Sequence, residues 1–390
     1  MPGMTFDNNN SEIAGLEKSA GSKKHGRIDA TFFLLTLILL TIGLIMLFSA
    51  GYYYAQHYRD GNSFHFIQRQ AIWAGLGLVL MIIFTFINYQ IFKKLAFITF
   101  AVSVIMLIIV LFMPPLNNAR RWISIGPINF QPSEVAKFAI ILLFAFLISK
   151  NYKKMPTFSY GVLPFVFFIG IVSVLMMMQT HLSGTVLIMA IGFLMMFVGG
   201  TKYRYFLLAI AVAAVAVIGL VTILGVGYVQ ERLSGWIDPF SDTSNSTHQT
   251  YQSLLTIGSG GLLGVGLGGS NQKFLYLPEP QNDFIFSVVC EELGFIGAAI
   301  IIILFALFVY RGFVIASKAP DKFGMMMAVG ITGQIGIQAL LNIAVVTNTV
   351  PNTGISLPFF SYGGTALMMQ LAQIGIVLNI SRRANMEIKG

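Results

Sequence analysis

Long apolar runs constrain this chain more than any other feature of its sequence. Runs of about 20 residues, the length that an α-helix needs to cross the hydrocarbon core of a membrane, can be placed ten times in the 390 residues. The chain is 56% hydrophobic and only 10% charged, which excludes a soluble globular domain. We therefore expect an all-α polytopic membrane protein, with spans at about 30–51, 68–88, 91–113, 132–149, 158–178, 183–200, 203–224, 284–310, 323–347 and 361–380.

The sequence outside these spans is short. Residues 1–27 are polar and predict a disordered cytoplasmic tail, with the first span acting as an uncleaved anchor rather than a signal peptide. Residues 28–390 then form one transmembrane domain. The only long connection, at about 225–282, exceeds the roughly 12–15 residues of an ordinary loop and is rich in aromatic and apolar residues. We expect this loop to fold back on the membrane surface or to re-enter the membrane.

The basic residues predict how the chain is oriented. With the N-terminus in the cytoplasm, 17 of the 24 Lys and Arg residues fall inside and six fall outside, while Lys137 lies within a span. This bias is typical of a protein with both termini in the cytoplasm. The net charge of +9 is thereby explained by topology, and no nucleic-acid partner is needed.

A cluster of acids leads into the eighth span. Residues 277–294, LPEPQNDFIFSVVCEELG, carry four of the fifteen acids, namely Glu279, Asp283, Glu291 and Glu292. A carboxylate at or near a bilayer boundary is expensive to keep ionised, so it is a candidate functional group. The alternative is that Glu279 is a solvated loop acid and that Asp283 only caps the following helix.

Cationic residues lead into the fourth span. Arg120 and Arg121 lie in an outside segment, against the positive-inside trend, which favours a functional role over simple anchoring at the interface. Lys137 lies within the span, where a lysine must snorkel, pair or face a wet cavity. Glu134 is three residues earlier on the same helical face, so these two residues could simply be each other's partner.

The remaining outside segments contribute two further candidates. His181, in the turn before the sixth span, could titrate near neutrality, although a histidine in a turn is more often a surface hydrogen-bonding residue. Ser361 belongs to a polar segment, residues 352–365, that precedes the last span.

Two glycine patterns are structural. Gly264, Gly266 and Gly269 satisfy G-x-G-x-x-G, but no β-strand precedes them, so we prefer flexible packing near a lipid headgroup to dinucleotide binding. The glycines at 330, 333 and 336 recur every three residues and predict close helix packing.

Together the polar candidates indicate chemistry on an anionic lipid. All of them are expected on one membrane face, where arginines and a lysine can hold phosphate oxygens. Glycosyl transfer from a lipid pyrophosphate needs a carboxylate to deprotonate the attacking hydroxyl and cations to stabilise the leaving pyrophosphate. The residues alone predict an outside-facing membrane site for an anionic lipid.

Five segments give the chain a family resemblance. The chain resembles the SEDS family of bacterial wall synthesis, which contains the RodA, FtsW and SpoVE proteins, over nearly its whole length after residue 27. The resemblance rests on the ordered segments ARRWISIG (119–126), QPSEVAK (131–137), QSLLTIGSGGLLGVGLGGS (252–270), LPEPQNDFIFSVVCEELG (277–294) and TGISLPFFSYGGT (353–365).

That resemblance implies an inverting peptidoglycan glycosyltransferase. It would polymerise lipid II, an undecaprenyl-pyrophosphate-linked donor, at the outer face of the bacterial cytoplasmic membrane, with a class B penicillin-binding protein as partner. The family's essential aspartate falls on Asp283, its loop arginine on Arg121 and its lysine on Lys137. Asp283 would be the general base, with or without a divalent cation (Mg or Mn). Arg121 and Lys137 would hold pyrophosphate, and Glu134 would orient Lys137.

The chain departs from the family pattern at two places. Gln281-Asn282 stands where many members have His-Thr, and Thr180 stands where proline is usual. These changes affect local hydrogen bonding and leave the three charged residues in place.

Two other functions remain compatible with the sequence. A lipid II flippase would also have ten helices with buried charges, but it should carry polar groups along its whole path, whereas the polar groups here cluster outside. A non-catalytic scaffold of the wall-synthesis complex would keep its cellular function when Asp283 is replaced.

Overall fold

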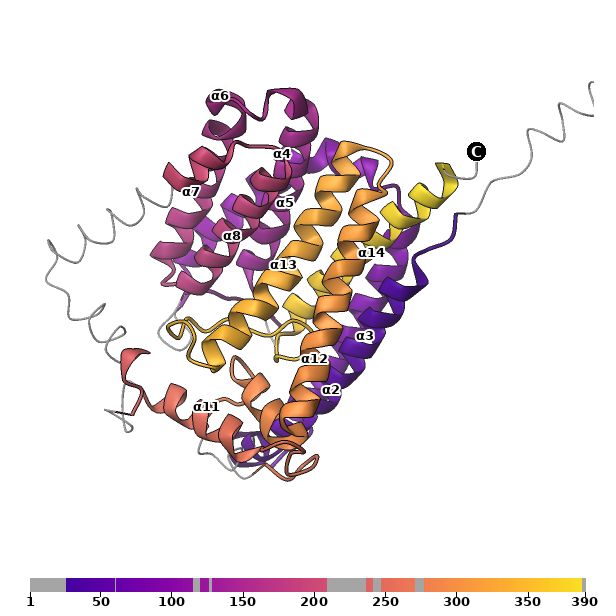
Figure 1. Cartoon of the computed structure of the whole chain (residues 1–390). Helices are drawn as coiled ribbons and strands as arrows, with labels where there is room; N and C mark the ends of the chain where they lie inside the picture. Colours follow the sequence, from indigo (N-terminus) through magenta and orange to yellow (C-terminus); the bar gives the residue numbers. More distant parts are fainter. Residues whose placement is uncertain are drawn as a thin grey trace, which may run out of the picture.

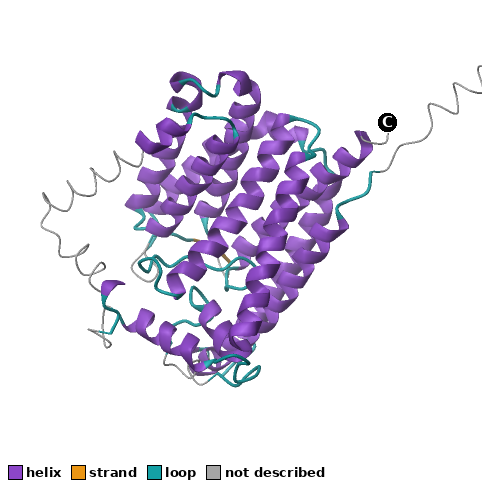
Figure 2. Ribbon diagram, in the orientation of Figure 1, coloured by secondary structure: helices purple, strands orange, loops and turns teal. Residues whose placement is uncertain are grey.

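The computed structural model describes residues 26–59, 61–114, 120–125, 128–208, 236–240, 247–270 and 277–387. Its helices run side by side in one bundle, with α11 lying across one end (Figures 1 and 2). We refer to this as the α11 end. The helices are α2 (Ala30–Tyr58), α3 (His65–Phe86), α4 (Gln90–Leu111), α5 (Pro132–Asn151), α6 (Phe158–Gly161), α7 (Leu163–Met178), α8 (Leu182–Val198), α11 (His248–Ser259), α12 (Ile285–Ser317), α13 (Lys322–Val346) and α14 (Gly364–Glu387), with a short 3₁₀ turn at Tyr152–Lys154.

The helices match the expected membrane spans. Eight are long and apolar enough to cross a membrane, counting α6 and α7 together, and α8 is a shorter apolar helix. These helices correspond to nine of the ten predicted spans, so the all-α polytopic class is confirmed. The seventh predicted span, 203–224, lies mostly outside the described residues, as do the predicted tail 1–27 and much of the loop at 225–282.

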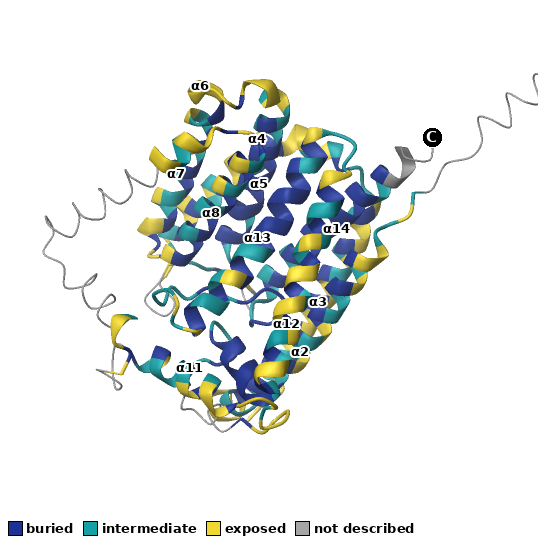
Figure 3. Cartoon of the chain, in the orientation of Figure 1, coloured by how far each residue is buried: buried dark blue, intermediate teal, exposed yellow. Residues whose placement is uncertain are grey.

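The centre of the bundle is formed by α5, α13 and α14, whose side chains are mostly buried (Figure 3). The glycines of α13 contact three different helices. A methyl group on Gly330 would lie 2.5 Å from Ile141 of α5, one on Gly333 would lie 2.1 Å from Leu194 of α8, and one on Gly336 would lie 2.8 Å from Val309 of α12. Small residues let helices approach closely where lipid offers no hydrophobic driving force. The predicted glycine packing is confirmed.

The Gly-rich run in the long loop fills a break in α12. At Gly294 the helix backbone is non-helical, with φ 69° and ψ −174°. The amides of Val265 and Gly266 donate to the carbonyls of Glu291 and Glu292, both at 3.0 Å. Beyond the break, the amides of Phe295 and Ile296 donate to the carbonyls of residues 261 and 262, at 2.9 and 3.2 Å.

These hydrogen bonds correct the expectation of flexible packing at this loop. Buried backbone groups released by a helix break must find other partners, and the loop backbone supplies them. Gly264 has φ +78°, and a methyl group there would lie 2.3 Å from the carbonyl oxygen of Glu292. Gly264 is therefore required by backbone-to-backbone contact with α12.

A β-hairpin, which the sequence did not predict, connects α4 to α5. Strand β1 (Ile123–Ile125) pairs antiparallel with β2 (Ile128–Phe130), with Ile123 opposite Phe130. Three-residue strands escape a search for alternating hydrophobicity, which needs about four residues or more. The hairpin fixes how the chain passes from Arg121 to the start of α5.

A carboxylate at the end of the bundle opposite α11 links two helices. Asp29 caps α2, because its Oδ1 accepts a hydrogen bond of 2.9 Å from the amide of Phe32. The same carboxylate forms an ion pair of 2.8 Å with Arg311 near the end of α12. Its own amide donates to the hydroxyl of Ser381 in α14. Asp29 is thus fully used in joining helix ends.

Candidate functional site

Two segments, α13 and the loop that precedes α14, hold Asp283 at the α11 end of the bundle. Its backbone carbonyl accepts a hydrogen bond of 2.7 Å from the side-chain amide of Asn342 in α13. The same amide donates to the carbonyl of Ile355, at 2.6 Å. The neighbouring Gly354 lies against the carboxyl group, because a methyl group there would be 3.0 Å from Oδ2. Asn342 therefore joins the Asp283 backbone to the loop that precedes α14.

The carboxyl group of Asp283 has no structural task. The residue that caps α12 is Phe284, which makes no side-chain capping bond, so the alternative of a helix cap does not apply. Within the described part of the chain, no donor binds the half-buried carboxylate.

The surroundings of this group make it a weaker acid. Burial, and then the charge of Glu279, raise the pKa of Asp283 to about 6, while Arg121 acts in the opposite direction. A carboxylate with a pKa close to the working pH is suited to general base catalysis.

Glu279 supplies the second carboxylate. It is held in a positive-φ conformation (φ 46°), and its Oε2 accepts a hydrogen bond of 2.7 Å from the side-chain amide of Asn282. The backbone carbonyl of Gln281 accepts from the amide of Tyr362 at 2.8 Å. Of the residues that depart from the family pattern, Asn282 therefore stabilises this loop through its side chain, whereas Gln281 contributes only its backbone carbonyl.

Glu134 and Lys137 form a buried ion pair in the first turns of α5. Lys137 Nζ lies 2.8 Å from Glu134 Oε2, and both residues are less than 10% exposed. The prediction that Glu134 and Lys137 pair with each other is thus confirmed. Lys137 also lies 3.5 Å from the side-chain oxygen of Gln338, whose amide donates to Ser356. The pair is thereby connected to the loop that carries Gly354.

The two arginines have different positions. Arg121 donates to the backbone carbonyl of Thr180 in the turn between α7 and α8, and its charge acts on both Asp283 and His181. Arg120 is exposed and donates to the carbonyl of Leu111 at the end of α4, at 2.9 Å. The structure therefore brings Arg121 towards Asp283 and leaves Arg120 at the rim.

His181 is buried, which corrects the expectation that it could titrate near neutrality. Its Nε2 lies 3.2 Å from Gln131 Nε2 and 3.4 Å from Ser133 Oγ, and its Nδ1 lies 3.3 Å from Ser183 Oγ. Burial, with the nearby charges of Arg121 and Lys137, lowers the pKa of His181 to about 3. The ring is neutral at physiological pH and connects the α7–α8 turn to the start of α5.

Ser361 is not brought to Asp283. Its hydroxyl accepts a hydrogen bond of 2.7 Å from the amide of Leu357, and its carbonyl accepts one of 3.2 Å from the side chain of Gln70 in α3. The hydroxyl thus closes the loop before α14. A role for Ser361 in substrate binding has no support from this geometry.

Two residues important to the site, Gln338 and Asn342, were missed from the sequence. Both are fully buried amides in α13, four residues apart and hence on one helical face. They belong to no motif. The available signal was their occurrence within an apolar span, where polar side chains are costly.

Comparisons with known proteins agree with this fold. The family model described as "Cell cycle protein", which covers FtsW, RodA and SpoVE, matches residues 29–386. The chain is 38% identical to Stage V sporulation protein E of Bacillus subtilis (strain 168), covering 91% of this chain and 97% of that protein. It is 36% identical to the probable peptidoglycan glycosyltransferase FtsW of Geobacter sp. (strain M18), with coverage of 91% and 97%.

Solved structures of two related proteins have a similar fold. A chain from a peptidoglycan synthase complex that coordinates polymerization and crosslinking superimposes with a TM-score of 0.78 and 27% identity, covering 92% of this chain and 98% of that chain. The rod shape determining protein RodA of Thermus thermophilus gives a TM-score of 0.66 at 27% identity, with coverage of 91% and 97%.

Proposed function

This chain belongs to the FtsW/RodA/SpoVE family, and on that premise we propose that it is a peptidoglycan glycosyltransferase that polymerises lipid II. The observation that carries the proposal is the carboxyl group of Asp283. This group is half-buried and accepts no hydrogen bond from the described residues. Its pKa is raised to about 6, and the positive charge of Arg121 acts on it.

In the proposed step, Asp283 takes the proton of the acceptor sugar hydroxyl as its oxygen attacks the anomeric carbon of the donor. The bond from that carbon to the phosphate oxygen breaks, and the pyrophosphate leaves with the electron pair. Attack from the face opposite the leaving group inverts the configuration. Arg121 and Lys137 are the cations that hold the pyrophosphate, because guanidinium and ammonium groups stabilise charge developing on phosphate oxygens.

Glu134 is assigned to position Lys137. The ion pair of 2.8 Å holds the ammonium at the first turns of α5, in the direction of Gln338 and the Ser356 loop. A lysine without this carboxylate would be an isolated buried charge in a membrane span. Arg120 and Glu279 lie around this centre, Arg120 at the rim and Glu279 as the charge that tunes Asp283.

A divalent cation remains a proposal. Among the described residues, no three His, Cys, Asp or Glu side chains gather into a metal-binding group. Asp283 and Glu279 do interact as like charges, and Mg²⁺ is commonly bound by one or two carboxylates together with substrate phosphates. This pair fits a Mg or Mn ion that would supply positive charge to the pyrophosphate.

The proposed location is the outer face of the bacterial cytoplasmic membrane. The bias of Lys and Arg residues towards the cytoplasmic segments supports an outward-facing site at the α11 end. The proposed partner is a class B penicillin-binding protein, and the structural similarity to a chain of a peptidoglycan synthase complex supports such an assembly.

The test is glycan synthesis from lipid II in detergent, with the purified protein bound to its penicillin-binding partner. Detergent removes the need for transport across a membrane. We expect glycan strands from the wild type and from Asp238→Asn, which alters an exposed acid in the described stretch 236–240, and none from Asp283→Ala.

Two results would contradict this proposal. Equal synthesis by Asp283→Ala would move the chemistry away from this carboxylate. No synthesis by the wild type with a transpeptidase of verified activity would favour the flippase or the scaffold.

A further inference from the structure

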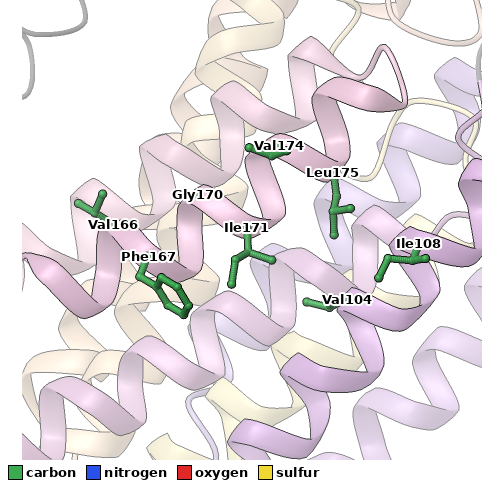
Figure 4. A pocket seen from close by; sticks show the side chains of 8 residues that line it. All are labelled: Val104, Ile108, Val166, Phe167, Gly170, Ile171, Val174 and Leu175. Atoms are coloured by element: carbon green, nitrogen blue, oxygen red, sulfur yellow. The ribbon is translucent and has the colours of Figure 1, made fainter.

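An apolar groove runs along the outside of the bundle between α4 and α7 (Figure 4). It has a volume of about 580 Å³ and is lined only by apolar residues, including Val104 and Ile108 of α4 and Val166, Ile171 and Val174 of α7. From Val166 to Leu175 its wall extends about 14 Å along α7, at 1.5 Å per residue.

Gly170 opens the middle of this groove. A methyl group added to Gly170 would meet no atom within 4 Å. The glycine leaves space where another residue would fill the groove, and a larger side chain there would project into it without a clash.

The groove ends beneath the two arginines of the candidate site. Gln179, just after α7, donates a hydrogen bond of 3.0 Å to the carbonyl of Leu107, the residue before Ile108 of the groove wall. Arg120 donates to Leu111, one turn beyond Ile108, and Arg121 donates to Thr180, which follows the end of α7. The two helices that form the groove therefore each end at a carbonyl bound by an arginine.

This arrangement has the shape of a site for an anionic lipid with a long apolar chain. An apolar channel suits the chain, and two guanidinium groups at its end suit the phosphates, which arginine binds bidentately. An ordinary zwitterionic phospholipid would gain less from the paired positive charge.

We propose that the groove between α4 and α7 binds a segment of the isoprenoid chain of the lipid substrate while Arg120 and Arg121 bind its pyrophosphate. The identity of this lipid as a polyprenyl pyrophosphate rests on the proposed function. In this role Arg120, at the rim of the site, contacts the substrate from the groove side, and Arg121 connects the groove to Asp283.

The test uses undecaprenyl pyrophosphate with a photoreactive group in its chain, bound to the purified full-length protein. Labelled peptides are mapped after irradiation. We expect labels on α4 and α7 in the wild type and in Asp283→Ala, because binding of the chain does not require the base.

A matched pair of variants tests the groove itself. Gly170→Phe fills it, whereas Gly75→Phe adds the same side chain to an exposed position of α3 that also has no atom within 4 Å. We expect labelling of α4 and α7 to be largely lost in Gly170→Phe, because the added ring would occupy the space that the lipid chain fills. Gly75→Phe should label like the wild type. Arg120→Ala combined with Arg121→Ala should reduce labelling as well.

The outcomes separate this inference from the proposed function. If the labels fall outside α4 and α7 while glycan synthesis is intact, the proposed groove site is wrong and the proposed glycosyltransferase function still holds. A photoreactive phospholipid that labels the groove and is not displaced by excess undecaprenyl pyrophosphate would identify it as a site for ordinary membrane lipid and also overturn the inference. Specific labelling of α4 and α7 by a wild type that makes no glycan would support the groove and contradict the proposed function.

Discussion

The two ends of the bundle use aspartate in opposite ways. Asp29 caps α2 and forms an ion pair with Arg311, so its carboxylate is fully engaged in joining helices. The carboxylate of Asp283 caps nothing and has no hydrogen-bond donor in the described part of the chain, and its pKa is raised to about 6. The comparison separates an acid that stabilises the fold from one that the fold holds in a reactive state at some cost in stability.

The largest expected effect is on the reactive acid. Asp283→Asn keeps the shape of the side chain but removes the base, so we expect glycan synthesis to fall by about 10²–10⁴-fold, the range for loss of a general base. Thermal stability should be unchanged or higher, because a poorly solvated charge is removed. Asp29→Ala should show the reverse, with near-normal synthesis and a loss of about 1–2 kcal/mol of stability from the missing cap and ion pair.

These two variants are compared by rate and by melting temperature of the purified protein. A stability loss in Asp283→Asn as large as that in Asp29→Ala would mean that both acids are structural, and the contrast between the two ends would not hold.

The Glu134–Lys137 ion pair of α5 combines the two roles that Asp29 and Asp283 show separately, because it is buried in the bundle and also lies near the candidate site. Lys137→Met leaves Glu134 as an unpaired buried charge, which costs about 3–5 kcal/mol of stability. The double variant Glu134→Gln with Lys137→Gln removes both charges and should recover most of that stability.

Synthesis by the double variant distinguishes structure from function. If Lys137 holds the pyrophosphate, recovered stability should not restore glycan synthesis. Recovery of both would assign the pair to folding alone.

A smaller effect is expected where backbone contact, rather than charge, shapes the α11 end. Gly294→Ala places a methyl group 2.3 Å from the amide nitrogen of Gly264. The backbone conformation of Gly294 (φ 69°, ψ −174°) is essentially restricted to glycine and alone costs about 1–3 kcal/mol for another residue. Melting temperature should fall. Gly75→Ala, in open space on α3, is the control and should be neutral; an equal fall in both variants would contradict the close contact at the break in α12.

The sequence was sufficient to predict the features that depend on residues close together in the chain. The starts of nine apolar spans were placed within a few residues because a membrane helix must be long and apolar, although α2, α12 and α14 extend beyond their predicted ends. The spacing of Gly330, Gly333 and Gly336 predicted packing, and each glycine does contact a neighbouring helix. Asp283, Lys137 and Arg121 were candidates because charge is rare in such a chain, and the family resemblance then singled them out.

What could not be predicted depends on contacts between distant segments. The burial of His181 depends on contacts with Gln131 and Ser133 at the start of α5, about 50 residues earlier in the chain. Ser361 and Arg120 belong to motifs, yet the hydroxyl of one closes a loop and the guanidinium of the other binds the end of α4. Motifs indicate that a residue matters, whereas the direction of its side chain is set by the folded chain.

The central claim is that Asp283 acts as a base whose pKa is set by burial and by Glu279. The most direct test is the pH dependence of glycan synthesis at constant magnesium concentration for the wild type and Glu279→Gln. The base must be deprotonated, so the wild-type rate should rise with pH through about 6 and then level off. Removal of the neighbouring negative charge lowers the pKa of Asp283, so the rise in Glu279→Gln should occur at lower pH. A wild-type rate that does not change between pH 5 and pH 8, or a rise that Glu279→Gln leaves in place, would contradict the account.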